Sequence, residues 1–188
     1  MKKTLLIVLT ACLVGVALYL ALGKDDGAAD TASNKQPKAA TQSDQTSPPA
    51  APTELVIGNA NAPITIIEYG DYKCPKCNEF HETAGKDIRR EWVDTGKAKI
   101  VYRPYPLFGE DSGLALYASF CAAEQGKFTA YHDKLFHHMW TNYFSKGNYD
   151  AAIEKLFSPE KLGELAGQVG LDATAFTTCA AGRTHADA

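Results

Sequence analysis

Two cysteines three positions apart, Cys74 and Cys77, are the residues of this sequence best suited to chemistry. They stand in the segment YGDYKCPKCNEF, residues 69–80, and enclose a Pro-Lys dipeptide. A pair with this spacing at the start of a helix can close a small disulfide ring, and the thiolate is the reactive form of cysteine. The unpaired N–H groups and the dipole of a helix N-terminus stabilise such a thiolate. We therefore expect Cys74, at the helix tip, to be the attacking thiol and Cys77 to be the resolving thiol.

Residues close to the pair are expected to adjust its reactivity. Pro75 suits the first position of a helix, and Lys76 places a positive charge between the sulfurs that favours the thiolate. A stabilised thiolate makes the disulfide a stronger oxidant. Glu68 lies in an otherwise apolar strand, six positions before Cys74. It either relays protons to the leaving thiolate or is a strand-end acid that reaches solvent. Asp71 is interpreted as a turn residue.

The same pair of cysteines also permits interpretations other than redox chemistry. A zinc site needs two more ligands at a characteristic spacing, and the sequence has no second CxxC motif. A copper carrier is an alternative in which His81, or His137 with His138, supplies nitrogen ligands. A purely structural bridge is disfavoured because its loop is too short to add much stability. Redox chemistry is the interpretation that the motif favours.

Two further cysteines, Cys121 and Cys179, fall on the apolar faces of two predicted helices. In an exported domain we expect them to pair as a structural disulfide that closes a long loop. Two buried free thiols are the alternative.

The N-terminal part of the sequence predicts export. Lys2 and Lys3 precede the uncharged run 4–22, which is long enough to cross a bilayer with the following chain on the outer side. We expect residues 1–23 to be a signal anchor. A cleaved signal peptide and a lipoprotein acylated at Cys12 are the alternatives. Residues 24–53 contain no large apolar side chain and predict a flexible linker.

Residues 54–188 carry the pattern of a folded α/β domain. A net charge of −3 without a basic stripe argues against nucleic-acid binding. A buried strand is predicted over 62–70, a helix over 74–93 and a second strand over 98–103, which together form a parallel βαβ unit. The helix is expected to bury an apolar stripe of residues spaced four apart, which are Phe80, Ala84, Ile88 and Trp92. Helical patterns then fill residues 110–182, with Ser158 and Asp172 as two of the predicted N-caps.

The segment APITIIEYGDYKCPKCNEFHE resembles the active-site segment of DsbA-like thioredoxin-fold disulfide oxidoreductases, in particular the membrane-anchored, single-domain kind. The segments YRPYPLFGEDSGLALYASFCAAEQGKFTAYHDKLF and GLDATAFTTC resemble the following strand, the inserted helices and the later Cys-bearing helix of that family. The resemblance implies a thioredoxin-like fold with a helical insertion at about 110–182. It also implies attack by Cys74, resolution by Cys77 and a proton-exchanging role for Glu68.

One departure from the family pattern concerns the end of the chain. The family continues after its helical block with a cis-proline loop, two strands and a helix, and we expect this chain, which ends at Ala188, to lack them. In the family that loop docks the substrate and keeps metal away from the CxxC pair. We therefore expect this departure to weaken substrate binding and stability. An inactive truncated fragment is an alternative interpretation of the chain.

Together these features predict a thiol-disulfide oxidoreductase tethered to the cell envelope by residues 4–22, with its domain on the outer side. We expect it to donate the Cys74–Cys77 disulfide to exported cysteine-containing proteins through a mixed disulfide. A membrane partner would then reoxidise the dithiol, and no organic cofactor or metal is expected. A reductase or isomerase is one alternative, and a copper-binding or copper-delivery module is another.

Overall fold

The computed structural model of this chain describes residues 52–182. The predicted anchor, residues 1–23, and almost all of the predicted linker lie outside the described residues. Within the described part, no helix is both long and apolar enough to cross a membrane.

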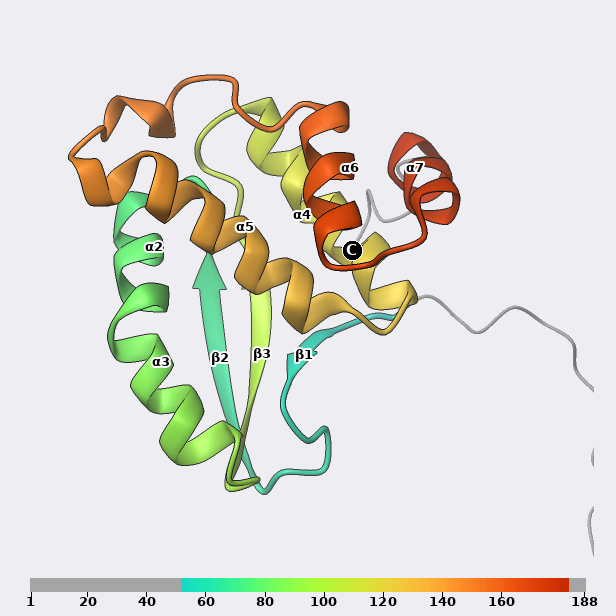
Figure 1. The fold of residues 1–188 in the computed structure, drawn as a ribbon. Helices are drawn as coiled ribbons and strands as arrows, with labels where there is room; N and C mark the ends of the chain where they lie inside the picture. The colour runs from blue at the N-terminus through green and yellow to red at the C-terminus, as the bar shows by residue number, and fades with distance from the viewer. Residues whose placement is uncertain (1–51, 183–188) are drawn as a thin grey trace, which may run out of the picture. The chain divides into compact units, whose positions relative to one another are not determined.

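Three strands form the sheet, in the order β1-β3-β2. Strands β2 (Ile64–Gly70) and β3 (Ala98–Pro104) pair in parallel, as predicted. Strand β1 (Leu55–Ile57) pairs antiparallel with the other side of β3 (Figure 1). The sequence did not predict β1 because three apolar residues are too few to show the alternation of a strand.

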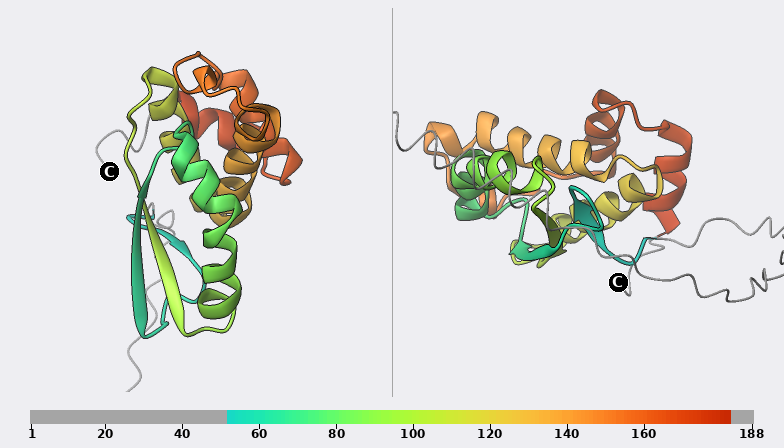
Figure 2. Two further views of the ribbon diagram at one scale, coloured as in Figure 1. Left: turned by 90° about the vertical axis from the view of Figure 1, so that its left-hand side faces the viewer. Right: turned by 90° about the horizontal axis from the view of Figure 1, so that it is seen from below.

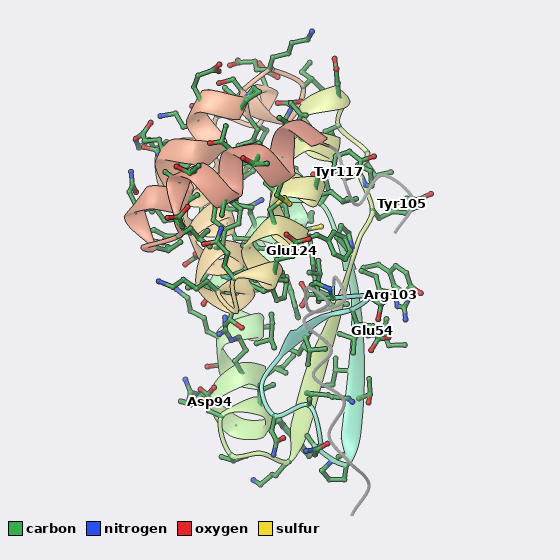
Figure 3. The ribbon with its side chains drawn as sticks, turned by 90° about the vertical axis from the view of Figure 1, so that its right-hand side faces the viewer. Glu54, Asp94, Arg103, Tyr105, Tyr117 and Glu124 are labelled. Atoms are coloured by element: carbon green, nitrogen blue, oxygen red, sulfur yellow. A yellow bond between two sulfur atoms is a disulfide. The ribbon has the colours of Figure 1, made fainter. Side chains whose placement is uncertain are left out.

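The prediction that β2 is buried is wrong. It is an edge strand of the described sheet, and Ile67 and Tyr69 are 54% and 67% exposed. The helices α2 (Pro75–Glu82), α3 (Ala84–Ile88) and α5 (Phe128–Asn142) lie on one side of β2 and β3. Among the described residues, no helix runs along the other side of β2 (Figure 2). On that open side Arg103 Nη2 lies 3.3 Å from Glu54 Oε1 (Figure 3). A continuous apolar run predicts full burial only when both faces of the sheet are covered.

The predicted single helix over 74–93 is three consecutive pieces. They are α2 (Pro75–Glu82), α3 (Ala84–Ile88) and the π-helical turn η1 (Arg89–Val93). The backbone breaks at Thr83, which has φ −120° and ψ −100°. The predicted apolar stripe is also wrong, since Phe80 and Trp92 are 39% and 45% exposed. The break and the π turn change the helical phase, and the buried side chains of α2 are instead polar ones, Asn78 and His81.

The helical block after β3 follows the prediction closely. It consists of α4 (Glu110–Glu124), α5 (Phe128–Asn142), α6 (Pro159–Gln168) and α7 (Ala173–Gly182), with short 3₁₀ turns η2 (Phe144–Lys146) and η3 (Asp150–Ala152). The predicted caps are confirmed. The Ser158 hydroxyl accepts from the N–H of Lys161 at 3.2 Å, and the Asp172 carboxylate accepts from the N–H of Ala175 at 2.7 Å.

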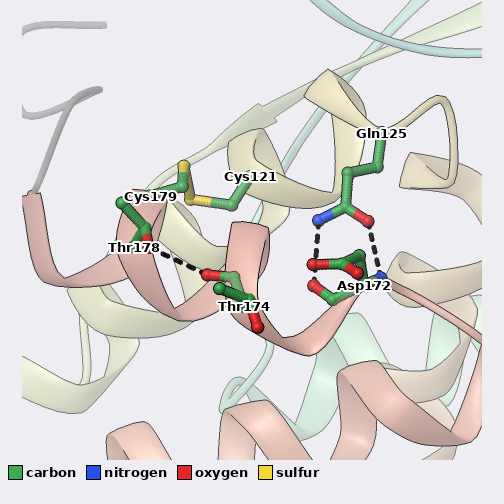
Figure 4. Close-up of a disulfide and its surroundings, with 6 residues drawn as sticks. All are labelled: Cys121, Gln125, Asp172, Thr174, Thr178 and Cys179. Atoms are coloured by element: carbon green, nitrogen blue, oxygen red, sulfur yellow. Dashed lines mark hydrogen bonds between the residues drawn. A yellow bond between two sulfur atoms is a disulfide. The ribbon is translucent and has the colours of Figure 1, made fainter.

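Helix α7 is attached to α4 at two places (Figure 4). Cys121 of α4 and Cys179 of α7 form a disulfide with an S–S distance of 2.03 Å. Near the other end, the Asp172 N–H donates to Gln125 Oε1 at 2.8 Å, and Gln125 Nε2 donates to the Asp172 carbonyl at 3.4 Å. The block is therefore closed by one covalent and one polar connection.

Loss of this disulfide is expected to lower stability strongly. The two cysteines are 58 residues apart in sequence. A cross-link over a loop of this length is expected to contribute about 4 kcal/mol to the free energy of unfolding. The double variant Cys121→Ala, Cys179→Ala should lose about that amount in urea unfolding. Gln125→Ala, which removes only the polar connection, should lose about 1 kcal/mol. Equal losses in the two variants would contradict the expectation.

Candidate active site

The structure places Cys74 at the N-cap of α2. Its backbone is extended there, with φ −75° and ψ 119°, and Pro75 occupies the start of the helix. The Cys74 sulfur accepts a hydrogen bond from the N–H of Cys77 at 3.3 Å. An N-cap oxygen normally takes this position, so the sulfur faces the unpaired donors of the helix N-terminus. Both cysteines are free thiols and partly buried.

Cys77 has different surroundings, because it packs against the hydrophobic core. Burial raises the pKa of Cys77 to about 12, and the hydrogen bond with the Cys74 side chain acts in the same direction. A hydrogen bond with the backbone of Asp71 opposes these two effects. A thiolate formed on Cys77 therefore takes up a proton readily at neutral pH. Attack through Cys74 and resolution through Cys77 remain predictions, and this contrast between the two sulfurs supports them.

Lys76 points into solvent, with 85% of its side chain exposed. Its ammonium bonds Glu79 Oε2 at 2.6 Å, and this hydrogen bond raises the pKa of Lys76. The charge expected to act on the sulfurs is thus partly offset by a carboxylate and screened by water. A tuning effect of Pro75 or Lys76 on the pair remains a prediction.

Asp71 is a buried hydrogen-bond acceptor for two separate segments, and not simply a turn residue. It is 4% exposed. Its Oδ1 accepts from the Lys73 N–H at 2.8 Å and from the Ser112 hydroxyl at 3.0 Å. Its Oδ2 accepts from the N–H groups of Leu107 and Phe108 at 2.7 and 3.2 Å. The loop that leads into Cys74 is therefore fixed to the loop between β3 and α4.

Lys73, the residue before Cys74, is completely buried. Its ammonium donates to Asp111 Oδ1 at 2.8 Å and to the carbonyls of Phe108 and Glu154 at 3.0 and 2.6 Å. A buried charge is stable only when it is paired and fully hydrogen-bonded, and these three acceptors meet that requirement. We call Asp71, Lys73 and Asp111 the buried charge network.

Asp111 completes this network on the helical side. Its Oδ2 accepts from the N–H groups of Leu156 and Phe157 at 2.8 and 3.2 Å. Burial alone would raise the pKa of Asp111, but the hydrogen bonds from Lys73 and from these two N–H groups hold it below its usual range. Lys73 and Asp111 were not predicted from the sequence because their partners lie 35 to 81 positions away along the chain.

A second polar cluster surrounds Glu68. With His81, Arg89 and His132, this carboxyl lines a cavity of about 110 Å³ behind β2. Burial raises the pKa of Glu68, and the charges of His81 and Arg89 oppose that effect. Glu68 is thus a partly buried acid beside a space large enough for water. This position supports the proton-relay interpretation of Glu68.

Within the described residues, a possible metal-binding group consists of His81, His132 and Asp133, whose ligand atoms lie within 4.8 Å of one another. Neither cysteine of the CxxC pair belongs to this group. The Asp133 Oδ1 atom already accepts from His81 Nε2 at 3.1 Å and from Arg89 Nη1. The guanidinium beside this carboxylate opposes the binding of a cation, so the group is better described as a hydrogen-bonded cluster that joins α2 and η1 to α5.

The parallel β2–α2–β3 unit, with a CxxC pair at the N-terminus of α2, defines a thioredoxin-type fold with helices inserted after β3. In agreement, a family model described as thioredoxin matches residues 50–185. The chain belongs to the thioredoxin family.

Individual relatives show which kind of thioredoxin-family protein this chain is similar to. Disulfide bond formation protein D of Bacillus subtilis (strain 168) is 33% identical over 90 residues, which are 47% of this chain and 40% of the relative. The probable disulfide bond formation protein D of Bacillus cereus is 30% identical over 86 residues, which are 45% of this chain and 40% of the relative. The matched segment spans about two fifths of the length of these relatives.

The crystal structure of oxidised BdbD from Bacillus subtilis superposes with a TM-score of 0.59 at 27% identity, covering 71% of this chain and 68% of that one. Wolbachia pipientis alpha-DsbA1 superposes with a TM-score of 0.52 at 26% identity, covering 69% and 60%. The predicted resemblance to DsbA-like thioredoxin-fold proteins is confirmed.

The buried charge network yields a prediction about stability. Lys73→Met removes the ammonium and leaves Asp111 as an unpaired buried carboxylate, so the free energy of unfolding should fall by about 3–5 kcal/mol. Lys76→Met is the matched control, because it removes an exposed lysine from the same segment and should change stability little. Urea unfolding at pH 7 measures both. Similar midpoints for the two variants would contradict the role assigned to Lys73.

The burial of His132 leads us to expect that the free energy of unfolding depends on pH. It is 1% exposed on α5, and burial lowers the pKa of His132 to about 3, with the charge of His81 acting in the same direction. The unfolded chain takes up a proton at this residue near pH 6.5, and the folded chain does not. Acidification therefore favours unfolding, by about 2 kcal/mol between pH 7 and pH 5.

Urea unfolding at pH 7, 6 and 5 measures this dependence. The His132→Gln variant, which cannot titrate, should show a flatter pH dependence over the same interval. Equal slopes for the unmodified chain and the variant would show that His132 is not the titrating group.

Proposed function

We propose that this chain is a thiol-disulfide oxidoreductase that donates its Cys74–Cys77 disulfide to cysteine-containing proteins outside the cytoplasm. The observation that carries the proposal is the contrast between the two sulfurs. Cys74 caps a helix N-terminus, where a thiolate is stabilised, and Cys77 is set against the core with a raised pKa. The names of the relatives, which include disulfide bond formation protein D, support the same activity.

The reaction follows from this contrast. A substrate thiolate attacks the Cys74 sulfur, the Cys74–Cys77 bond breaks, and its electron pair leaves on the Cys77 sulfur. Glu68 supplies the proton that neutralises Cys77 and regains one from solvent. A second substrate thiolate then attacks the substrate sulfur of the mixed disulfide and releases Cys74 as a thiolate. The substrate loses two electrons, and the enzyme gains them as its reduced dithiol.

Turnover requires a partner that takes these two electrons back. We propose that this partner is a membrane protein and that residues 4–22 hold the domain beside it on the outer side of the membrane. The charge asymmetry of Lys2 and Lys3 before an uncharged run supports this arrangement. The same site acts in the opposite direction, as a reductase or isomerase, if its redox potential is low.

The direction is tested by equilibrating the full-length chain in detergent with a series of glutathione redox buffers at pH 7. Peptide mass spectrometry after thiol trapping follows Cys74 and Cys77 separately from the other cysteines. We expect one two-electron transition with a midpoint more positive than about −200 mV, in the range of disulfide donors. Cys74→Ser is the control and should abolish the transition. A pair that stays oxidised even in the most reducing buffers has a low potential, which would contradict the donor proposal and support a reductase.

A further inference from the structure

Asn78, the residue after Cys77 on α2, is completely buried. Its side-chain nitrogen Nδ2 donates to the carbonyl of Tyr72 at 2.7 Å and to the carbonyl of Cys74 at 2.9 Å. Its Oδ1 atom has no hydrogen-bond partner. Turning the amide over would not help, because the oxygen would then face two carbonyl acceptors. The unpaired oxygen is therefore a consequence of what the nitrogen binds.

An asparagine at this buried helical position is unfavourable by itself. Asparagine is a weaker helix former than leucine, and a buried polar atom without a partner loses its hydration without compensation. A leucine, which has nearly the same shape, would avoid both penalties. The two carbonyl contacts are the interactions that favour asparagine here. Both carbonyls belong to the segment that carries Cys74.

The Asn78 side chain joins the turn before α2 to the first turn of the helix. The preceding turn is closed by the N–H of Cys74, which donates to the Asp71 carbonyl at 3.0 Å, and Tyr72 is the second residue of that turn. The Cys74 carbonyl also accepts from the backbone N–H of Asn78 at 3.0 Å. Asn78 thus holds the N-cap residue with both its backbone and its side chain, and it holds the preceding turn with the same side chain.

These contacts determine where the Cys74 sulfur lies. The backbone of Cys74 is extended, and this conformation directs the sulfur to the N–H of Cys77 at 3.3 Å. If the turn can shift against α2, the sulfur moves away from this donor and from the helix N-terminus. A thiolate at Cys74 then loses the stabilisation that the helix end provides.

We propose that Asn78 is a positioning residue for the Cys74 thiolate. The inference rests on the proposed disulfide exchange, in which Cys74 is attacked by the substrate and is later released as a thiolate. Asp71 and Lys73 fix the same loop to neighbouring segments, whereas Asn78 fixes it to α2 itself. By keeping the Cys74 sulfur at the helix end, Asn78 stabilises the reduced pair and makes the disulfide a stronger oxidant.

The test isolates Cys74 in the full-length chain in detergent by the substitution Cys77→Ser, which keeps the backbone N–H that bonds the Cys74 sulfur. The rate of alkylation of Cys74 by iodoacetamide, followed by peptide mass spectrometry from pH 4 to pH 10, reports the thiolate fraction. Adding Asn78→Leu should lower the rate about tenfold on the rising limb of this pH profile, because a hydrogen bond to a charged sulfur is lost. The rate reached at high pH should stay the same.

Ser119→Ala is the matched control. Ser119 is also completely buried and also binds Tyr72, but it donates to the Tyr72 hydroxyl, at 2.7 Å, and not to the backbone. This variant should lower the thermal midpoint and leave the alkylation profile of Cys74 unchanged. An unchanged profile in Asn78→Leu would overturn the inference, as would equal shifts of the profile in the two variants.

Asn78→Ser is a milder variant that decides the question if Asn78→Leu does not fold. A serine hydroxyl on a helix can donate to the carbonyl four residues earlier, which here is that of Cys74, but it is too short to bind the Tyr72 carbonyl as well. This variant should slow alkylation on the rising limb about threefold. A lower thermal midpoint with an unchanged profile would show a purely structural role and overturn the inference.

The alkylation rate does not require the chain to exchange disulfides. Failure of the proposed function would instead appear in the glutathione titration of the unmodified chain, so the two failures are distinguishable.

Discussion

The buried ammonium of Lys73 must be surrounded by hydrogen-bond acceptors. The segments that supply these acceptors are thereby held together around the CxxC pair. The acceptors come from the loop before α4, from α4 itself and from the loop before α6. Lys73 is the residue before Cys74, so these segments are fixed beside the Cys74 sulfur. Asp71 acts in the same way from the other side, since its carboxylate holds the N–H groups of Leu107 and Phe108.

This network gives the dithiol its asymmetry. Cys74 can cap α2 only if the chain enters the helix in an extended conformation, and the bonds of Asp71 and Lys73 fix that entry. Cys77 then falls one turn later, on the side of α2 that faces the core. Two identical side chains three residues apart thereby obtain different surroundings from one short helix. The N-terminus of α2 supplies the N–H donors, and the loops around it determine that the Cys74 sulfur faces them.

Local signals predicted much of this architecture. The β-branched run of β2, Pro75 at the start of α2, and Ser158 and Asp172 as caps depend on neighbours within a few residues, so the sequence shows them directly. The CxxC pair and Glu68 were singled out for the same reason, and their roles remain predictions. The exposure of β2 was not predictable, because it depends on what covers the second face of the sheet. The short strand β1 carried too few residues for any pattern.

The buried charges were not predictable for a different reason. A lysine in a sequence ordinarily indicates a solvent-exposed position, and only its distant acceptors make burial of Lys73 possible. Such features arise where segments far apart in sequence meet.

The disulfide between α4 and α7 has a consequence for biosynthesis. The four cysteines of the described part appear in the order Cys74, Cys77, Cys121 and Cys179, and four cysteines allow three pairings. Cys121 emerges 58 residues before its partner, when Cys74 and Cys77 are already present. A premature bond from Cys121 to either of them would join α4 to α2 and trap a non-native chain. Correct maturation of this protein thus depends on the order in which its own thiols become available for oxidation.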